Sequence, residues 1–453
     1  MTSNDLHAAS PGWSGVSRRR FLASAAACTA VPTFVPAAVL GREGQVAPND
    51  RITLAVFGVG NRGSSSLRAM EPLPDHQVVA IADCRRDRGE LALQRVEKHY
   101  AQRVGRESYR GCRLYSDFRE VLARSDIDAV WGCVPDHWHG VIFSRVIEAG
   151  MDLYGEKPVT RWIAEGVHVR DAVRRHGCVF QTGTQQRSQR TFRHACELAR
   201  NGYLGKVRRI EVAAPGGRSY PVQPPSDPPP GFDYDMWTGP APYFPFDTNR
   251  CEWLAMYMIS HYCAGFISNW GVHHLDIAGW GCPEVFEEPF HVEGTGVLPQ
   301  EGMTDTWISW QMDLRWPSGL EMHFVNTGNP HPQGCRFIGD EGWVHVNRRG
   351  ISAEPESLLQ VQLGANDQPL HASPDYSDPF TAHTADFFRS IRTRQDPVSP
   401  VEEGQAASTL GNVCDIALRL GRALTWDPSR DCFIDEDQAN GMLARAARSP
   451  WSI

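Results

Sequence analysis

The stretch of sequence that decides the fold is R-I-T-L-A-V-F-G-V-G-N-R-G at residues 51–63. Its first half, residues 51–57, is apolar like a buried strand, and residues 64–70, which follow the stretch, favour a helix. Glycines between a strand and a helix let the backbone approach a pyrophosphate, which binds at the N-terminus of the helix. The pattern predicts a dinucleotide-binding loop with these contact residues: Gly58, Gly60, Asn61, Arg62 and Gly63.

An acidic residue stands where this fingerprint requires one. A second strand is predicted over 77–82, and Asp83 follows it, about 20 residues beyond the last glycine. Its carboxylate would accept hydrogen bonds from the adenosine ribose, which favours NAD. Arg85 and Arg86 come next and could hold a 2′-phosphate, so NADP remains open. A glycine turn without a ligand is the other alternative, and the combined strand, helix and acid argue against it.

Three further strands are predicted at residues 128–134, 152–155 and 178–181. After the first of them, Asp136 is a good N-cap for a helix that continues through 141–149. Ligands collect at the carboxyl ends of strands in open α/β sheets, and we therefore place Asp136 and His139 near the ligand. Residues 48–185 are predicted to form an α/β nucleotide-binding domain of the Rossmann type.

The pattern changes beyond about residue 205. Apolar and polar residues alternate with period two at 206–212, 306–316 and 320–324. A proline-rich stretch at 220–230 is predicted as an ordered surface loop, and closing helices are predicted near 382–394 and 404–424. Residues 186–430 are therefore expected to form a second α/β domain with a largely antiparallel open sheet, covered by helices on one face. Residues 431–453 are expected to be a C-terminal tail.

The composition is that of an ordinary globular chain. Its 453 residues would make roughly three domains of about 150 residues, with 41% hydrophobic and 22% charged residues. The formal net charge of -8 argues against a nucleic-acid-binding protein. The 12 cysteines include no C-x-x-C pair, which argues against a zinc ribbon or a small disulfide scaffold.

The N-terminus has the features of an export signal. Residues 17–22, S-R-R-R-F-L, match the twin-arginine pattern and precede an Ala-rich apolar run at 23–40. A small-residue cleavage site near Ala37 predicts a signal peptide over 1–37, the twin-arginine export machinery as a partner and a periplasmic location. This route exports folded proteins, commonly with their cofactor, so we expect a tightly bound nucleotide. A basic patch before a hydrophobic helix is the alternative.

Lysine is rare in this chain. Only Lys98, Lys157 and Lys206 are lysines among 45 basic residues, and arginine cannot release its proton near neutral pH. Lys157 follows a predicted strand, between Glu156 and Pro158. It is predicted to act as a general acid or base beside the nicotinamide, with a pKa lowered by partial burial. The alternative is a surface ion pair with Glu156.

A second cluster lies at residues 268–278. On a helix, Asn269, His273 and Asp276 would share one face, while His274 would point elsewhere. His273 could take the proton of a substrate hydroxyl, Asn269 could orient that hydroxyl, and Asp276 could fix the imidazole tautomer. The alternative is a histidine that belongs to the core. Further histidines near residue 138 allow a metal site, but no H-E-x-x-H spacing is present, so no metal is expected.

Four further motifs, in this order, accompany the glycine fingerprint: V-P-D-H-W-H at 134–139, G-E-K-P-V at 155–159, T-G-T-Q-Q at 182–186 and G-V-H-H-L-D at 271–276. Together they resemble the glucose-fructose oxidoreductase, inositol dehydrogenase and MocA (Gfo/Idh/MocA) family over nearly the whole chain after the signal. The resemblance implies a Rossmann domain followed by a C-terminal α/β domain. It also implies a homo-oligomer formed through the open C-terminal sheet.

The resemblance implies roles for individual residues. Lys157 would serve as proton relay and nicotinamide contact, and His273 as acid and base on a sugar hydroxyl. The cofactor-side positions of the family match Pro135, Glu156 and Gln185. There is one departure, because many sugar dehydrogenases of the family have aspartate where this chain has Asn269. The proton relay thereby loses a carboxylate.

Two enzymatic functions are compatible with these residues. The first is an NAD(P)-dependent oxidoreductase that acts on a sugar or cyclitol hydroxyl and keeps its cofactor tightly bound. The second is an NAD-dependent glycoside hydrolase of the α-N-acetylgalactosaminidase type, in which transient oxidation at C3 permits elimination of the glycoside before the hydride returns. A third, non-enzymatic alternative is a sugar-binding protein with a vestigial nucleotide site, which the presence of both Lys157 and His273 argues against.

Overall fold

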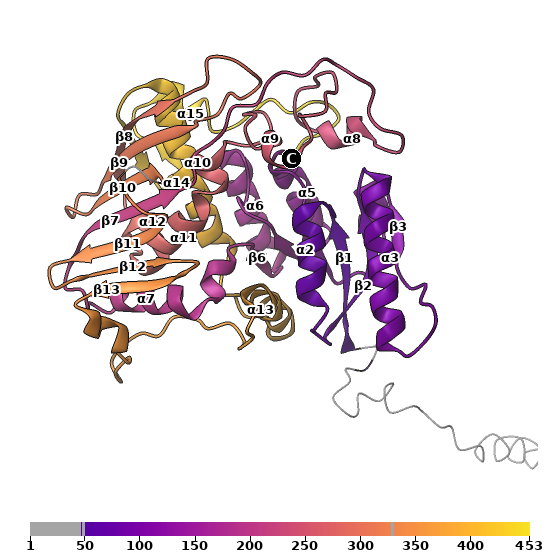
Figure 1. Ribbon diagram of the computed structural model, residues 1–453, viewed down its shortest axis with the longest axis horizontal. Helices are drawn as coiled ribbons and strands as arrows, with labels where there is room; N and C mark the ends of the chain where they lie inside the picture. Colours follow the sequence, from indigo (N-terminus) through magenta and orange to yellow (C-terminus); the bar gives the residue numbers. More distant parts are fainter. Residues whose placement is uncertain (1–46, 48–49, 328–329) are drawn as a thin grey trace, which may run out of the picture. The chain divides into compact units, whose positions relative to one another are not determined.

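The computed structural model describes residues 47, 50–327 and 330–453 of the chain. Residues 52–453 form one compact unit, and Figure 1 shows its elements in chain order by colour. The predicted twin-arginine signal at 1–37 lies outside the described residues. Within the described ranges, every helix is too short or too polar to span a membrane.

The first sheet is parallel and has the strand order β3-β2-β1-β4-β5-β6. Its strands are β1 (Ile52–Phe57), β2 (His76–Ala82), β3 (Arg113–Tyr115), β4 (Ala129–Gly132), β5 (Asp152–Gly155) and β6 (Phe180–Thr182). This is the order of a dinucleotide-binding fold, with its switch point between β1 and β4. The predicted Rossmann-type architecture is confirmed.

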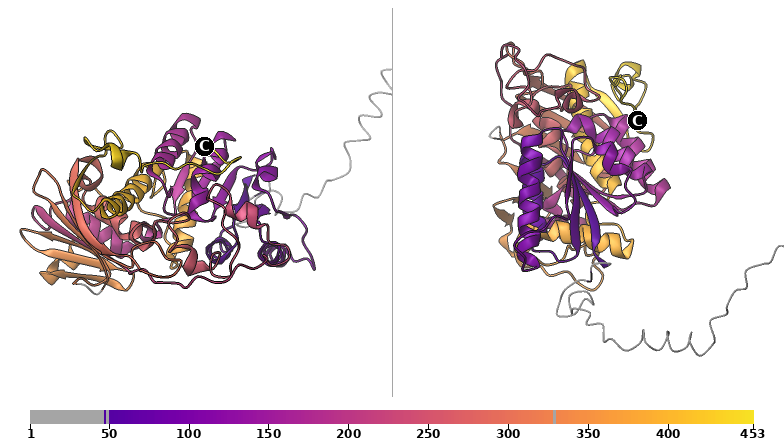
Figure 2. Two further views of the ribbon diagram at one scale, coloured as in Figure 1. Left: turned by 90° about the horizontal axis from the view of Figure 1, so that it is seen from above. Right: turned by 90° about the vertical axis from the view of Figure 1, so that its right-hand side faces the viewer.

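Helices cover both faces of this sheet, as the right-hand view of Figure 2 shows. They are α2 (Asn61–Met70), α3 (Arg86–Arg103), α4 (Phe118–Leu122), α5 (Asp136–Glu148) and α6 (Ile163–His176). Two separate apolar clusters result, one on each face of the strands. A parallel sheet needs a layer of helices on each face, because its strands are apolar on both sides.

The second sheet is mixed and mostly antiparallel, in the order β13-β12-β11-β7-β10-β9-β8-β14-β15. Only the pair β7 and β10 is parallel within it. Its strands are β7 (Val207–Ala214), β8 (Phe290–Val297), β9 (Ser309–Arg315), β10 (Glu321–Asn326), β11 (Gly334–Gly339), β12 (Trp343–Asn347), β13 (Gly350–Glu354), β14 (Leu424–Asp427) and β15 (Cys432–Phe433). The predicted largely antiparallel sheet is confirmed.

One face of the second sheet is buried under helices. In β9, Trp310, Met312 and Leu314 are buried while Gln311 and Arg315 are exposed, as expected for period-two alternation. The main covering elements are α7 (Arg190–Arg200), α11 (Val272–Gly281), α12 (Glu284–Glu287) and α14 (Val401–Leu420). Further short elements are η3 (Gln185–Ser188), α10 (Phe266–Asn269) and η4 (Glu356–Gln360).

Two late segments of the chain return to the nucleotide-binding domain. Phe387 and Phe388 of α13 (Pro379–Thr393) join the apolar cluster beneath β1 and β2. The predicted tail, residues 431–453, carries α15 (Asp437–Asn440), and its Trp451 packs against Trp138 with ring centroids 4.7 Å apart. Residues 431–453 therefore do not form an extended tail: they begin in the second sheet as β15 and end against the nucleotide-binding domain at Trp451.

A long connection between β7 and α10 also reaches the nucleotide-binding domain. Residues 220–230 contain neither helix nor strand, as predicted. We call residues 231–262, which include α8 (Tyr234–Thr238) and α9 (Trp253–Met256), the crossing segment. Its backbone bonds to the residues after β2, because Asp233 N–H donates to Cys84 O and Gly231 O accepts from Arg86 N–H, each at 2.9 Å. In Figure 1, α8 lies beyond α5 on the side of α3.

Candidate active site

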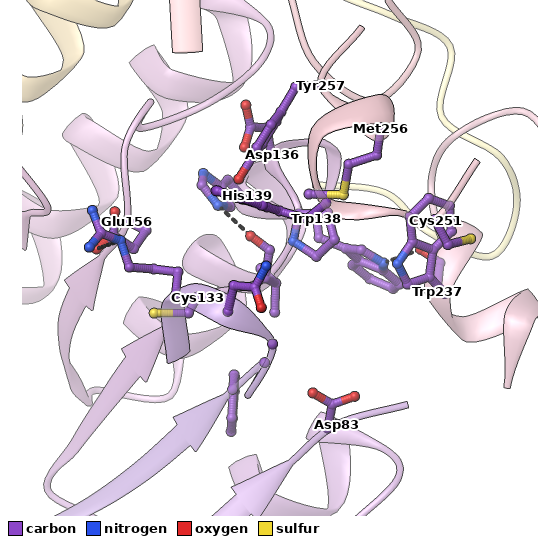
Figure 3. Close-up of a pocket in the computed structure, with 18 of the residues that line it drawn as sticks. Asp83, Cys133, Asp136, Trp138, His139, Glu156, Trp237, Cys251, Met256 and Tyr257 are labelled. Carbon is purple, nitrogen blue, oxygen red and sulfur yellow. Dashed lines mark hydrogen bonds and ion pairs between the residues drawn. The ribbon is translucent and has the colours of Figure 1, made fainter. Parts of the chain in front are cut away.

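A cavity of about 790 Å³ lies at the carboxyl ends of β1, β2, β4 and β5. The residues that close its other side come from the crossing segment, from the α10–α11 region and from Arg348. Figure 3 shows Asp83 at one end, separated from Glu156 and Asp136. Its volume falls within the range of cofactor and ligand pockets, about 300–1,000 Å³.

Most of the predicted cofactor residues line this cavity. They are Gly58, Gly60, Asn61, Arg62, Asp83, Pro135, Asp136, His139, Glu156 and Lys157. Helix α2 begins at Asn61, and no side chain caps its N-terminus, so its first N–H groups are suited to an anion such as a pyrophosphate. A Cβ at Gly60 would come within 3.3 Å of the Arg88 guanidinium, so glycine keeps this approach open.

Two predicted cofactor residues do not line the cavity. Gly63 packs α2 against the loop, since a Cβ there would lie 2.0 Å from Gly58 O. Gln185 lies behind the cavity wall, where its Nε2 donates to Tyr154 Oη at 2.6 Å and to Glu156 Oε1 at 3.0 Å. Both residues therefore support the site without facing the cavity.

Asp83 faces the cavity and braces the glycine loop. Its carboxylate accepts hydrogen bonds from the backbone N–H groups of Val59 at 2.7 Å and Arg85 at 2.8 Å. Burial raises the pKa of Asp83, although these two bonds oppose the shift. Each oxygen has a second lone pair, so the carboxylate can also accept a ribose hydroxyl.

Arg62 and Glu156 form an ion pair on the wall of the cavity. Arg62 Nε lies 3.1 Å from Glu156 Oε1, and the Glu156 side chain is almost fully buried. Burial is the largest influence and lowers the pKa of Arg62, but the Glu156 carboxylate together with Tyr154, Cys133 and Tyr257 outweighs it, so the net shift is upward. The pair places one fixed positive charge beside the glycine loop and one fixed negative charge beside Lys157.

Lys157 reaches across from the nucleotide-binding domain to Asn269. Its Nζ donates to the backbone oxygen of Asn269 at 2.9 Å and to Oδ1 at 3.0 Å. Burial lowers the pKa of Lys157, and the carboxylates of Asp136 and Glu156 partly offset the effect. The predicted direction of the shift is confirmed, and the alternative of a surface ion pair is wrong.

His273 lines the same cavity, and its side chain is only slightly exposed. Its Nδ1 is buried and has no hydrogen-bond partner among the described residues. Burial lowers its pKa strongly, and the nearby cations of Arg348 and Lys157 lower it further. At neutral pH the imidazole is therefore uncharged and can accept a proton. His274 lies in the core outside the cavity lining, as predicted.

The prediction that Asp276 fixes the His273 tautomer is wrong. Both carboxylate oxygens of Asp276 accept from Arg187, at 2.8 Å from Nε and 2.7 Å from Nη2. Arg187 is itself fully buried and also bonds to Glu403, so Asp276 belongs to a buried ion-pair network and not to the imidazole. The single predicted helix is also interrupted, since α10 ends at Asn269 and α11 begins at Val272.

The structure also corrects two roles at the start of α5. Asp136 is the first residue of the helix and not its N-cap, which is Pro135. The Asp136 carboxylate instead accepts from Asn269 Nδ2 at 2.9 Å. His139 lines the cavity, but its ring nitrogens face backbone oxygens, Nδ1 toward Pro158 at 2.7 Å and Nε2 toward Val134 at 3.0 Å. It therefore holds the backbone next to Lys157.

Several residues that line the cavity were not predicted from the sequence. Arg348 follows β12 and lies over the Trp270 ring at 4.7 Å, and burial lowers its pKa to about 10. Tyr257 and Trp237 come from the crossing segment. No motif marks these positions, because they meet the cavity only through the packing of the second domain. In the described part of the chain, no group of three or more histidine, cysteine or acidic residues could hold a metal ion.

Family comparisons cover both domains. A family model described as an oxidoreductase NAD-binding Rossmann fold matches residues 52–184. The C-terminal α/β domain model of the same oxidoreductase family matches residues 220–453.

Three curated relatives are similar over different lengths. The uncharacterized oxidoreductase YrbE of Bacillus subtilis is 26% identical over 190 residues, 42% of this chain and 49% of that protein. Myo-inositol 2-dehydrogenase of Thermotoga maritima is 20% identical over 380 residues, 82% of this chain and 97% of that protein. A glycosyl hydrolase family 109 protein of Streptomyces coelicolor is 29% identical over 180 residues, 36% of this chain and 37% of that protein. The match thus spans about half of YrbE and less of the hydrolase.

Solved structures share the fold. Aldose-aldose oxidoreductase from Caulobacter crescentus matches with a TM-score of 0.59 and 18% identity, over 83% of this chain and 100% of that chain. Scyllo-inositol dehydrogenase from Lactobacillus casei, solved with NAD(H) and scyllo-inositol, matches with a TM-score of 0.57 and 16% identity, over 83% and 99% of the two chains.

Proposed function

The chain belongs to the Gfo/Idh/MocA family of oxidoreductases, and we propose that it transfers hydride between a bound nicotinamide nucleotide and a hydroxyl-bearing carbon of a sugar or cyclitol. The observation that carries the proposal is the convergence of three features in one cavity. The glycine loop, Lys157 and His273 all line it, although they come from two domains. Inositol dehydrogenases among the relatives and matched structures support this class of substrate.

The residues present fit a dinucleotide. The uncapped start of α2 suits a pyrophosphate, and Asp83 suits the adenosine ribose at the far end of the cavity. Lys157, Asn269 and His273 then remain for the nicotinamide end and the substrate. The buried Nδ1 of His273, without a partner among the described residues, also favours a polar ligand here.

The charges of the cavity suit oxidation of an alcohol. When bound, the nicotinamide nucleotide supplies the hydride acceptor. His273 is neutral near pH 7 because its pKa is lowered, so it can take the hydroxyl proton. Lys157 and Arg348 provide positive charge that stabilises the negative charge developing on the substrate oxygen. Because burial lowers its pKa, Lys157 also passes a proton to and from that oxygen, which an arginine could not do. In the reverse direction His273 returns the proton to that oxygen.

We favour NAD over NADP. Asp83 presents a carboxylate to the cavity, which repels a 2′-phosphate. Arg85 and Arg86, the two residues that could hold that phosphate, are each ion-paired with a carboxylate of their own helix. Arg88 also lines the cavity, beside Gly60.

We also propose that the nucleotide is retained between turnovers. The crossing segment lies over the cavity and is fixed to the nucleotide-binding domain by Trp237 O, which accepts from Trp138 Nε1 at 3.0 Å and lies 2.9 Å from His137 Nε2. The lining residues that it contributes include Met236, Trp237, Trp253, Leu254, Met256 and Tyr257. These side chains would cover a bound nucleotide and slow its release.

A second candidate function is redox-assisted glycoside cleavage. The family 109 hydrolase relatives and a segment that closes over the cavity both favour it, because such a cycle returns the hydride to the substrate. One assay distinguishes the dehydrogenase from the glycoside hydrolase. The purified protein, with no added NAD, is mixed with a panel of free sugars and cyclitols and with chromogenic glycosides. Release of chromophore identifies the hydrolase, and accumulation of reduced nicotinamide identifies the dehydrogenase. No response to either panel from nucleotide-loaded protein would contradict both.

We also propose that the protein is exported to the periplasm and that it forms a homo-oligomer. The twin-arginine string at 17–22 supports transport of the folded, nucleotide-loaded protein to the periplasm. The open face of the second sheet supports a homo-oligomer through β7 and β9–β12. Periplasmic fractionation of the full-length protein and light scattering of the purified protein test these two points.

A further inference from the structure

A buried chain of three side chains links the two domains inside the cavity. Asn269 lies in the middle, with its Oδ1 accepting from Lys157 Nζ at 3.0 Å and its Nδ2 donating to Asp136 Oδ2 at 2.9 Å. Lys157 can only donate and an ionised Asp136 can only accept, so this orientation of the Asn269 amide is the one that satisfies both neighbours. Asp136 and Asn269 are 5% and 3% exposed, so water competes little for these bonds.

The Asp136 carboxylate is bonded to the neutral Asn269 amide and not to a cation within the described part of the chain. Among the described residues, no lysine or arginine lies within ion-pair distance of it, whereas Glu156 is paired with Arg62. Its charge is stabilised by its position in the first turn of α5 and, through the Asn269 amide, by Lys157. The thiol of Cys263 and the hydroxyl of Tyr257 lie near it, and burial raises the pKa of both. Figure 3 shows Asp136 beside Tyr257.

We propose that Asp136 is a positioning residue that sets the charge and the orientation of Lys157 through the Asn269 amide. Asp136 thereby supplies the carboxylate that the relay lacks at position 269. The effect on turnover rests on the proposed oxidoreductase function, whereas the effect on the Lys157 ammonium does not.

An aspartate at position 136 and an asparagine at position 269 suit the hydrogen bonds of this chain of side chains. An aspartate at position 269 would place two carboxylates 2.9 Å apart, where neither can donate unless one is protonated. The amide avoids this conflict, because it accepts on one side and donates on the other. Exchanging the two residues, Asp136→Asn with Asn269→Asp, keeps one carboxylate and one amide and preserves a donor facing each acceptor.

The sign of the effect follows from the charges around Lys157. The groups that act on it are Asp136, Glu156, Arg62, Cys263 and His273. Burial lowers the pKa of Lys157, and Asp136 is the strongest of the groups that raise it. Loss of the Asp136 charge therefore lowers the Lys157 pKa further and increases the fraction of neutral amine at a given pH.

The scarcity of lysine makes a direct test possible. The full-length, nucleotide-loaded protein is labelled with a trace of acetic anhydride at several pH values, and acylation of each lysine is measured by mass spectrometry. Lys98 and Lys206 are exposed and serve as internal references. We expect Asp136→Asn to shift the labelling midpoint of Lys157 to lower pH and to raise its labelling near pH 7 by about tenfold. The exchanged double variant should return the midpoint to the wild-type value or above it.

Two comparisons make the outcome decisive. Glu165→Gln removes another buried carboxylate of the same domain, which pairs with Arg445 outside the cavity, and should leave the Lys157 midpoint unchanged. An unchanged midpoint in Asp136→Asn would overturn the proposal, as would the same shift in Glu165→Gln. If Asp136→Asn does not fold, the exchanged variant decides: a midpoint well below that of the wild type would overturn it. Failure of every sugar to react would contradict the proposed function and leave this titration result standing.

Discussion

The ammonium group of Lys157 bonds to both the backbone oxygen and the side-chain oxygen of Asn269, at 2.9 and 3.0 Å, although the two residues lie 112 positions apart. Lys157 follows a strand of the nucleotide-binding sheet, and Asn269 ends α10, which packs against α14 and α11 of the second domain. The contact therefore joins the side chain expected at the nicotinamide to the short helix that directly precedes α11, which carries His273.

Asp83→Ala should weaken NAD binding while the fold is kept. The variant removes the carboxylate expected on the ribose and also two bonds to the backbone at Val59 and Arg85. We expect a loss of NAD affinity of about tenfold or more, since hydrogen bonds to charged groups contribute about 1.5–3 kcal/mol. Calorimetric titration of nucleotide-stripped protein measures it, with circular dichroism as a check on folding. Unchanged affinity for NAD would remove Asp83 from the site.

Trp253→Ala should speed the loss of nucleotide. Trp253 lines the cavity from the crossing segment and is 53% exposed, so its truncation should disturb the core little. Tyr243 is a matched control, because it is 55% exposed in the same segment and does not line the cavity. The nucleotide content of each variant after extensive dialysis is measured by denaturing the protein and assaying the supernatant. Equal retention by Trp253→Ala and Tyr243→Ala would argue against closure by this segment.

Asp276→Asn should lower the stability of the fold and have little effect on catalysis. Breaking a buried ion pair from one side costs about 3–5 kcal/mol, and we expect the lower end of this range because Arg187 keeps its second carboxylate, Glu403. We expect a marked fall in the unfolding midpoint in denaturant, together with nearly normal turnover per folded molecule. If Asp276 fixed the His273 tautomer, the reverse would be found, with normal stability and a large loss of turnover.

Arg348→Gln should move the acid limb of the pH–activity profile upward. Burial and the Arg348 cation lower the pKa of His273, so the wild-type acid limb should lie below the usual histidine value of about 6.5. Removal of the positive charge favours protonated His273 and shifts the limb to higher pH. Arg336→Gln is the control, since Arg336 stacks on Trp343 away from the cavity. A limb that does not move in Arg348→Gln would contradict the role given to His273.

The sequence predicted the parts of this site that depend on local pattern. The glycine loop and Asp83 follow from strand, turn and helix signals within one βαβ unit, and Lys157 follows from its rarity and from its place after a strand. These features depend on neighbours in the chain, so periodicity and turn chemistry suffice to place them.

The two wrong roles, those of Asp276 and Asp136, involve partners distant in sequence. Asp276 has helical spacing to His273, but a buried arginine 89 residues earlier takes its carboxylate. Asp136 was given a capping role, yet its partner is Asn269, 133 residues later. Burial creates these pairings, because a charge enclosed by both domains must find a partner wherever the fold provides one. Spacing along the chain carries no information about such a partner.

The most direct test of the account is the turnover of Lys157→Arg, measured on whichever sugar or cyclitol the substrate panel identifies. Arginine keeps the positive charge but cannot exchange a proton near neutral pH. We expect turnover to fall by about 10²-fold or more while the nucleotide stays bound. His273→Ala should fall comparably, and the double variant should lose less than the product of the two, because residues that act together are not additive. Full activity of Lys157→Arg would contradict the mechanism.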